Sequence, residues 1–226
     1  MRHSSHPIVG CATPLSCQVT VGSAHNEATA NVRITQVVEV VEERERDGKL
    51  KALLQKHHSS RKNRVLVFGL YKKECSRMET MLQQAGWACN AVHGDKGQRD
   101  REDAVNAFKA GTAPLLIATD VAARGLDIPD VEVVINYSFP LTIEDYVHRI
   151  GRTGRAGKMG HAHTFFHAGD KAHAGELVNV LNNAGQPVPE SLMAFGCTTK
   201  KKVDKTYGAF FKDVDMTKKG TKIIFD

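Results

Sequence analysis

The sequence predicts an α/β fold in which a parallel β-sheet carries helices on both faces. Short apolar segments alternate along the chain with longer segments that have helical spacing. Several apolar segments are rich in Val, Ile and Leu without polar alternation, which is typical of strands buried on both sides. With 226 residues, 41% of them hydrophobic, the chain is large enough to bury a core of this kind.

The expected elements follow one another in a regular order. We expect strands at 32–42, 64–69, 87–92, 115–119, 131–137 and 161–167. We expect helices at 43–58, 71–85, 98–110, 142–152 and 171–184. Gly86 and Gly111 follow two of these helices and are typical C-terminal stops. Thr142 can cap the helix that follows it, and Glu144 and Asp145 in the first turn favour the helix dipole.

Composition divides the chain into three parts. Residues 1–31 have no sustained period, 32–197 carry the alternating pattern, and 198–226 form a Lys-rich extension. The formal net charge of +6 fits a polyanionic partner as well as simple solubility. The five cysteines have no C-x-x-C spacing, so we expect reduced thiols in an intracellular protein and no zinc ribbon. Neither a signal peptide nor a membrane span is expected.

In sheets of this kind, ligands bind at the carboxyl ends of strands. That rule directs attention to three strings, at 93–101, 119–127 and 148–155. The last reads His-Arg-Ile-Gly-Arg-Thr-Gly-Arg and has arginines at every third position. Gly151 and Gly154 weaken a helix, so the chain should leave helical geometry there. Evenly spaced guanidinium groups on a loop suit a phosphate chain, whereas the alternative is a solvated basic turn.

The string at 119–127 follows an apolar strand. Thr119 and the backbone N–H groups after it could hold a phosphate at the start of a short helix. The small residues Ala122, Ala123 and Gly125 would let a ligand approach closely, and Asp127 could accept hydrogen bonds from ribose hydroxyls. An ordinary strand-to-helix turn is the alternative.

The string at 93–101 combines a glycine turn with the start of a helix. Gly94 lies in the turn, and Gln98 and Arg101 lie near the first helical turn. A helix N-terminus beside an arginine is suited to phosphate. Taken alone, this string is better described as a plain capped turn.

Together the three strings resemble motifs IVa, V and VI of DEAD-box RNA helicases. The strand at 65–68 with Gly69 resembles motif IV, and the resemblance covers roughly 32–195. It implies the second RecA-like domain of such a helicase, a member of the P-loop NTPase superfamily without the P-loop itself. The expected partners are RNA, contacted mainly through its backbone, and the first RecA-like domain.

The resemblance also implies roles for single residues. The catalytic residues would be Arg152 and Arg155, which would face the γ-phosphate of ATP, with Arg155 the preferred arginine finger. Gly125 and Asp127 would also contact ATP. The RNA backbone would be lined by Gly94, Arg101, Thr119 and Arg124. His148 and Arg149 would couple the two domains at their seam.

The family's ATP-holding motifs are absent from this sequence, which contains no G-x-x-x-x-G-K-[ST], no Asp-Glu-Ala-Asp and no Ser-Ala-Thr. In the family these belong to the first RecA-like domain. We therefore expect the chain to be half of an ATP-dependent RNA helicase, inactive alone, that shares ATP and Mg²⁺ with that domain and has no metal ligand of its own. A truncated chain, an incomplete gene model and a diverged fragment all remain open. The alternative function is a stand-alone, non-catalytic module that binds RNA or a protein partner.

Flanking segments narrow the resemblance further. Those at 71–75, 131–155, 162–166, 170–175 and 207–209 look like the nucleolar DEAD-box helicases that process pre-ribosomal RNA. They imply a role in ribosome biogenesis and a location in the nucleus and nucleolus. The lone Trp87 is expected in the core. His57 and His58, at a helix end, are expected to be exposed.

Overall fold

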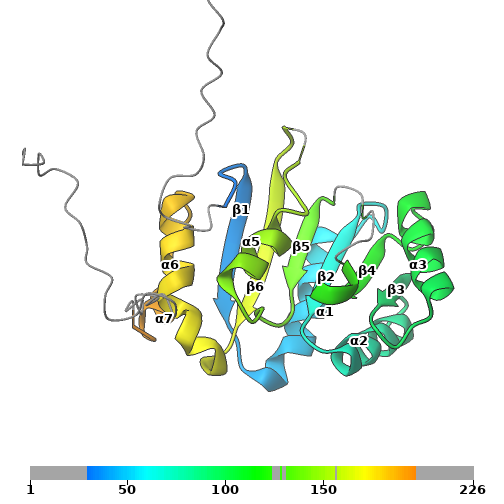
Figure 1. Ribbon diagram of the computed structural model, residues 1–226, viewed down its shortest axis with the longest axis horizontal. Coiled ribbons are helices and arrows are strands. Elements are labelled where there is room, and N and C mark those ends of the chain that lie inside the picture. The colour runs from blue at the N-terminus through cyan, green and yellow to red at the C-terminus, as the bar shows by residue number, and fades with distance from the viewer. Residues whose placement is uncertain (1–29, 124–127, 129–130, 156, 197–226) are drawn as a thin grey trace, which may run out of the picture.

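The structure, a computed structural model, describes residues 30–123, 128, 131–155 and 157–196. Its centre is a six-stranded sheet in the order β1-β6-β5-β2-β4-β3, in which every pairing of neighbours is parallel (Figure 1). The strands are β1 (Ile34–Val40), β2 (Val65–Gly69), β3 (Cys89–Val92), β4 (Leu115–Thr119), β5 (Val133–Asn136) and β6 (Gly160–Phe166).

Helices connect the strands. The α-helices are α1 (Arg46–His57), α2 (Lys72–Gln84), α3 (Gln98–Ala110), α4 (Asp120–Ala123), α5 (Ile143–Ile150), α6 (Ala174–Asn183) and α7 (Glu190–Met193). Two 3₁₀ helices, η1 (Glu43–Glu45) and η2 (Ala168–His173), precede α1 and α6. In the described part of the chain, none of these helices is long and apolar enough to cross a membrane.

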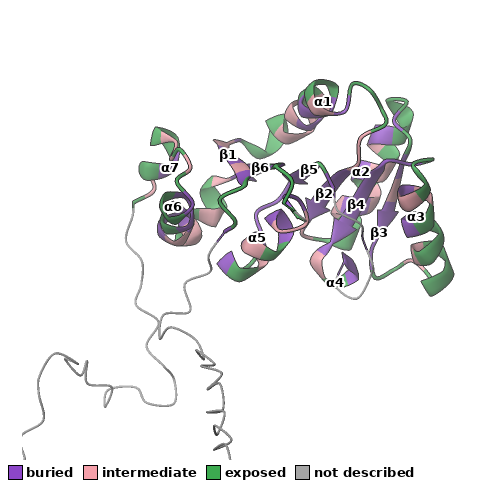
Figure 2. Ribbon diagram, turned by 90° about the horizontal axis from the view of Figure 1, so that it is seen from above, coloured by how far each residue is buried: buried purple, intermediate pink, exposed green. Residues whose placement is uncertain are grey.

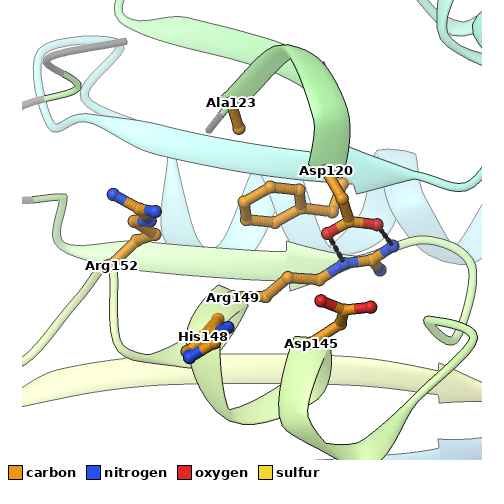
Figure 3. A pocket seen from close by; sticks show the side chains of 7 residues that line it. Asp120, Ala123, Asp145, His148, Arg149 and Arg152 are labelled. Atoms are coloured by element: carbon orange, nitrogen blue, oxygen red, sulfur yellow. Dashed lines mark hydrogen bonds and ion pairs between the residues drawn. The ribbon is translucent and has the colours of Figure 1, made fainter. Parts of the chain in front are cut away.

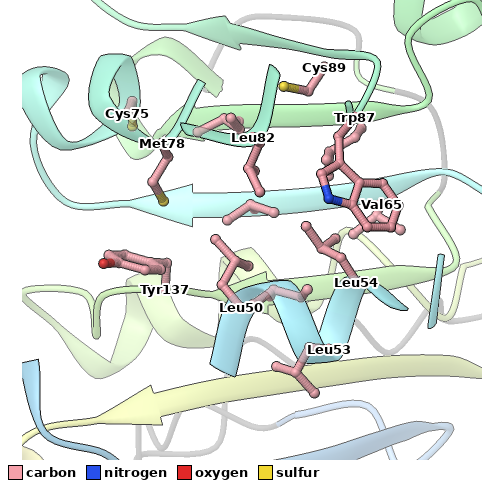
Figure 4. Close-up of a cluster of buried hydrophobic side chains, with 14 of the residues drawn as sticks. Leu50, Leu53, Leu54, Val65, Cys75, Met78, Leu82, Trp87, Cys89 and Tyr137 are labelled. Atoms are coloured by element: carbon pink, nitrogen blue, oxygen red, sulfur yellow. The ribbon is translucent and has the colours of Figure 1, made fainter. Parts of the chain in front are cut away.

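Helices cover both faces of the sheet (Figure 2). On one face, Leu50 and Leu54 of α1 and Met78 and Leu82 of α2 pack in one cluster with inward side chains of the central strands (Figure 4). Each fully buried side chain of this size contributes roughly 1.5–3 kcal/mol. Burial also raises the pKa of the Cys75 thiol in this cluster to about 12, so the thiol stays protonated.

The other face has two clusters. One joins Phe108 of α3 and the short α4 to β2, β3, β4 and β5. The second joins Tyr146 of α5 and Leu177 of α6 to β1 and β6, with Phe139 stacked on Tyr146 at 5.7 Å between ring centroids. The predicted parallel sheet with helices on both faces is therefore confirmed.

The expected strands and helices are all present, with shifted ends. The helix expected to reach residue 152 ends at Ile150, as the glycines that follow it indicate. α7 was not expected. The expected N-terminal segment, apart from residues 30 and 31, and the Lys-rich extension lie outside the described residues. The boundaries proposed at 31 and 197 stay predictions.

The expectation that His58 is exposed is wrong, since only 1% of it is accessible. The Asn63 side chain folds back over the end of α1: its amide donates to the His57 carbonyl at 2.5 Å, and its Oδ1 lies 2.9 Å from His58 Nδ1. The His58 ring packs on Trp87, which is buried as expected, at 5.5 Å between centroids. The loop between α1 and β2 thus buries the end of the helix.

Candidate nucleotide and RNA interface

Two of the three predicted strings meet at the carboxyl edge of the sheet. Thr119 is the last residue of β4 and pairs with Gly69 of β2, while Val92, the last residue of β3, pairs with Ala118. The turn that begins at His93 therefore lies beside Thr119. Because strand order and register alone produce this neighbourhood, the expectation for these two strings is confirmed.

The third string lies elsewhere. After α5, Thr153 forms a parallel bridge with Val131, just before β5 begins, and its hydroxyl donates to the Glu132 carbonyl at 3.0 Å. Residues 152–155 therefore run beside the amino ends of β5 and β6. The expectation that all three strings lie at the carboxyl ends is wrong for this one, because α5 carries the chain back along the sheet.

Arg149 bridges this separation. It projects from the last turn of α5, and its Nε and Nη2 atoms donate to the two carboxylate oxygens of Asp120 at 2.7 and 2.6 Å (Figure 3). Its Nη1 donates to the Ser138 carbonyl at 2.6 Å, and its guanidinium lies 5.1 Å from the centroid of the Phe68 ring. Only 1% of Arg149 is accessible. A buried guanidinium costs several kcal/mol in lost hydration, so the bidentate pair and the carbonyl are needed to offset that cost.

A pocket of about 290 Å³ opens beside this ion pair. In Figure 3, Arg152 and His148 lie toward one side of the pocket and Asp120 toward the other, with Arg149 between them. The side chains lining the pocket are Phe68, Asp120, Ala123, Asp145, His148, Arg149 and Arg152. Both carboxylates and cations line the pocket, so a bound ligand would meet basic and acidic groups here.

Backbone hydrogen bonds hold the arginine turn, residues 151–155, in place. Arg152 N–H donates to the Arg149 carbonyl and Thr153 N–H to the Ile150 carbonyl, which extends α5 by a tight turn. Gly154 has a φ of 69°, and a Cβ there would lie 2.7 Å from Ile34 Cγ1. A glycine is therefore required both by the left-handed backbone and by the close approach of β1.

Arg155 lies one turn from Arg152 and is exposed. Its Nε donates to the Gly151 carbonyl at 2.7 Å, and it does not line the pocket. Arg152 and Arg155 are thus presented from one glycine-flanked turn in two settings, Arg152 at the pocket wall and Arg155 toward solvent. The preference for Arg155 over Arg152 as arginine finger stays a prediction.

The predicted RNA string contains two buried polar atoms that lack a partner. His93 Nε2 lies 2.9 Å from Ser76 Oγ, but among the described residues neither His93 Nδ1 nor the buried Nε of Arg101 has a hydrogen-bond partner. Burial lowers the pKa of His93, so its imidazole is held neutral. Gly94 is exposed, and a Cβ built on it would meet nothing within 4 Å. Buried polar atoms without partners are uncommon, and these two lie in the turn at His93 and in the first turn of α3 after it.

Several predicted site residues lie outside the described residues, namely Arg124, Gly125 and Asp127. Among the described parts of the chain, no group of three or more His, Cys, Asp or Glu side chains could hold a metal ion.

The sequence reasoning missed the importance of Asp120. It was treated as part of a string, without a role, yet it supplies both oxygens that hold Arg149. A carboxylate directly after a buried strand is a usable signal, but its partner 29 residues away is set by the fold. Asp145, considered only for the helix dipole, also lines the pocket.

The chain is similar to known proteins. Residues 48–157 match the family described as "Helicase conserved C-terminal domain". The chain is 59% identical over 213 residues to DEAD-box ATP-dependent RNA helicase 5 of Oryza sativa subsp. japonica, an alignment that covers 94% of this chain and 41% of the relative. It is 58% identical over 211 residues to ATP-dependent RNA helicase DBP3 of Saccharomyces cerevisiae, covering 92% and 40%. The chain thus spans about 40% of the length of these relatives.

A solved structure agrees. The Escherichia coli DEAD-box protein SrmB, bound to regulator of ribonuclease activity A, superposes with a TM-score of 0.56 at 30% identity. The match covers 70% of this chain and 92% of that one. The expected RecA-like fold, the motif strings and these matches agree, and the chain belongs to the DEAD-box RNA helicases, as a helicase C-terminal domain of that family.

Proposed function

We propose that this chain is the second half of an ATP-dependent RNA helicase, which clamps the RNA backbone and supplies arginines for ATP hydrolysis. The observation that carries the proposal is the buried ion pair between Arg149 and Asp120. It connects the arginine turn to the residue that follows Thr119. A displacement of the arginines at the proposed nucleotide site would therefore move Arg149 and, through its ion pair, Asp120 next to the proposed RNA contact Thr119.

Arg152 and Arg155 fit the nucleotide role because guanidinium groups only donate hydrogen bonds and match phosphate oxygens in pairs. Arg152 lines the pocket, and Arg155 is open to solvent one turn further on, where a second domain could bring ATP. ATP with Mg²⁺ would supply the phosphoryl group and its charge neutralisation. Gly125 and Asp127 complete the proposed nucleotide contacts.

Gly94, Arg101, Thr119 and Arg124 are the proposed RNA contacts. Support comes from the buried Nε of Arg101, which has no partner among the described residues, and from the open surface at Gly94. These groups reach phosphate and ribose, which position a nucleic acid without reading its sequence. Binding should therefore be sequence-independent.

The chain is proposed to be inactive alone, because its sequence lacks the motifs that hold ATP and Mg²⁺ in this family. The first RecA-like domain is the proposed partner. His148 is exposed at the pocket and suits a contact with that domain. Arg149 is buried, so its proposed part in coupling is indirect, through Asp120.

Processing of pre-ribosomal RNA in the nucleus and nucleolus is the proposed setting. Support comes from the flanking segments that resemble this subgroup and from the 58% identity to the helicase DBP3 of Saccharomyces cerevisiae. The formal charge of +6 is consistent with an RNA partner.

The test joins this chain to a first RecA-like domain of a related DEAD-box helicase and measures ATP hydrolysis with and without RNA. Arg155→Ala should lower the RNA-stimulated rate by about 10³-fold or more, as expected for an arginine finger, and Arg152→Ala should also lower it strongly. Arg44→Ala is the matched control, because Arg44 is exposed and forms an ion pair with the exposed Glu42. Wild-type rates in both site variants would refute the assignment.

The chain by itself should hydrolyse no ATP at a helicase-like rate. If it nevertheless binds single-stranded RNA tightly and in a salt-sensitive way, the alternative of a stand-alone RNA-binding module gains support. ATP hydrolysis by the isolated chain would contradict the proposal that it is incomplete.

A further inference from the structure

A row of buried polar side chains leads away from Arg149 beneath α5. Asn136 of β5, Thr164 of β6, Tyr146 of α5 and Gln36 of β1 each have 0% accessible surface. The strands β5, β6 and β1 are neighbours, and Asn136 pairs directly with Thr164 in the register. Four buried polar residues on adjacent elements require hydrogen bonds among themselves, since a buried polar group without a partner is costly.

These residues form a continuous row of polar groups, in which hydrogen bonds join Asn136 to Thr164 and Tyr146 to Gln36. Asn136 Nδ2 donates to Thr164 Oγ1 at 2.9 Å, and the Thr164 hydroxyl lies next to the Tyr146 hydroxyl. Tyr146 Oη donates to Gln36 Oε1 at 2.9 Å. At the other end, Arg149 Nη1 lies 3.5 Å from Asn136 Oδ1. The Gln36 backbone N–H, on the edge strand, donates to Gln186 Oε1 at 2.9 Å and ends the chain.

The guanidinium determines the direction of every bond in this chain. Arg149 can only donate, so Asn136 must turn its oxygen toward Arg149 and its amide toward Thr164. Thr164 then accepts from Asn136 and has its own proton free for Tyr146. Tyr146 in turn donates to Gln36. Burial raises the pKa of the Tyr146 hydroxyl, which keeps it protonated as this donor.

Loss of the Thr164 hydroxyl would remove what holds the Asn136 amide in place. The amide could then rotate and present its NH₂ group to Arg149, so that two donors face each other in a low-dielectric interior. The 3.5 Å contact is long, and its effect is therefore through orientation more than through bond strength. A rotation of the guanidinium would also disturb the hydrogen bonds that Arg149 donates to Asp120 and to the Ser138 carbonyl.

We propose that Asn136, Thr164 and Tyr146 are positioning residues that hold Arg149 in the orientation in which it pairs with Asp120. The consequence for catalysis rests on the proposed function, because it is this ion pair that joins the arginine turn to the RNA-side residue Thr119. None of the three touches the pocket, so they act only through Arg149. The competing explanation is a purely structural polar cluster, whose removal would lower stability without moving Arg149.

The first test uses the 226-residue chain itself and ¹⁵N NMR of the arginine side chains. The Arg149 Nε–H proton, identified by its absence in Arg149→Lys, should exchange slowly with water because it is buried and bonded to Asp120. In Thr164→Val it should shift and exchange at least about tenfold faster, because the Asn136 amide loses the acceptor that holds it in place. Thr164→Ser retains the hydroxyl and should restore the wild-type signal. An unchanged Nε–H in Thr164→Val, or a Thr164→Ser signal equal to that of Thr164→Val, overturns the proposal.

Tyr146→Phe is the second variant and keeps the experiment decisive if Thr164→Val fails to fold. It removes the hydroxyl next to that of Thr164 but leaves the Asn136–Thr164 bond, so the Arg149 signal should move by less than in Thr164→Val. No movement at all in a folded Tyr146→Phe contradicts the proposal.

The second test measures RNA-stimulated ATP hydrolysis after fusion to a first RecA-like domain. Thr164→Val should lower kcat by about tenfold with a smaller change in the KM for ATP, and Thr164→Ser should recover most of the rate. If the wild-type fusion hydrolyses no ATP, the proposed function fails while the NMR result still decides the role of the buried chain. If the fusion is active and Thr164→Val has normal kinetics despite a displaced Arg149, the catalytic consequence is wrong.

Discussion

The guanidinium of Arg149 and the carboxylate of Asp120 form a bidentate pair, with N–O distances of 2.7 and 2.6 Å, between residues 29 positions apart. The pair joins the last turn of α5 to the first residue of α4. It also forms part of the wall of the pocket that Arg152 lines. The glycine turn follows this ion pair in the chain, and the carboxyl edge of β4 lies beside it.

Removing one member of the pair should destabilise the fold strongly. Asp120→Ala leaves a buried guanidinium without its counter-ion, so the free energy of unfolding should fall by about 3–5 kcal/mol. Arg149→Met in the same chain removes the buried charge as well. The double variant should therefore be more stable than the sum of the single changes allows, by about 1–3 kcal/mol. Urea unfolding of the four proteins measures this, and strictly additive effects would contradict the role given to the pair.

Thr119→Val combined with Arg101→Ala should weaken RNA binding more than ATP binding. Thr119 lies beside the turn at His93, and the buried Nε of Arg101 has no partner within the described protein. In the fusion with a first RecA-like domain, affinity for single-stranded RNA should fall by about tenfold or more, measured by fluorescence anisotropy. Arg99→Ala is the control, because Arg99 is exposed on the same helix. Equal losses for RNA and nucleotide would show that the roles are assigned wrongly.

Gly154→Ala and Gly157→Ala should differ in their cost. Both glycines have positive φ, 69° and 80°, so each substitution carries backbone strain of roughly 1–2 kcal/mol. Only at Gly154 would the new methyl group collide, at 2.7 Å from Ile34 Cγ1, whereas the nearest atom at Gly157 is Arg33 Nη1 at 3.7 Å. Thermal unfolding should show a larger loss of stability for Gly154→Ala than for Gly157→Ala. Equal losses would mean that β1 yields freely, and that the arginine turn is not held by this contact.

Stability should decrease as the pH falls below about 6.5, the ordinary pKa of histidine. Burial lowers the pKa of His58, although the hydrogen bond with Asn63 partly opposes this. The unfolded chain therefore binds a proton at a higher pH than the folded one, and the stabilisation present above pH 6.5 is lost as the pH falls through the folded pKa.

His58→Gln should make this pH dependence shallower, by at most about 1.4 kcal/mol per pH unit. Trp87→Phe is the control for packing, since it keeps a ring beside His58 and changes no titrating group. It should lower the unfolding free energy equally at all pH values. A His58→Gln slope identical to wild type between pH 7 and 5 would exclude His58 as a source of the effect.

Local patterns in the sequence predicted the elements because their causes are local. The glycines after α2 and α3, the Thr142 cap and the buried strands at 65–69 and 115–119 all depend on neighbouring residues. His58 was placed wrongly because its burial depends on a loop that folds back through Asn63. α7 was missed because it has only four residues and is stabilised by contacts with α6 and β1 rather than by its own pattern.

The sequence by itself determined the fold class, the family and the turn that presents Arg152 and Arg155, since periodicity, the octapeptide and glycine spacing are read along the chain. Only the tertiary structure decided that Arg149 faces inward to Asp120, that Asn136, Thr164 and Tyr146 support it, and that the arginine turn lies away from the carboxyl ends of the strands. The physical reason is that a buried charge selects its partners by proximity across the sheet. Strand order and register set that proximity, and neither is visible in local sequence.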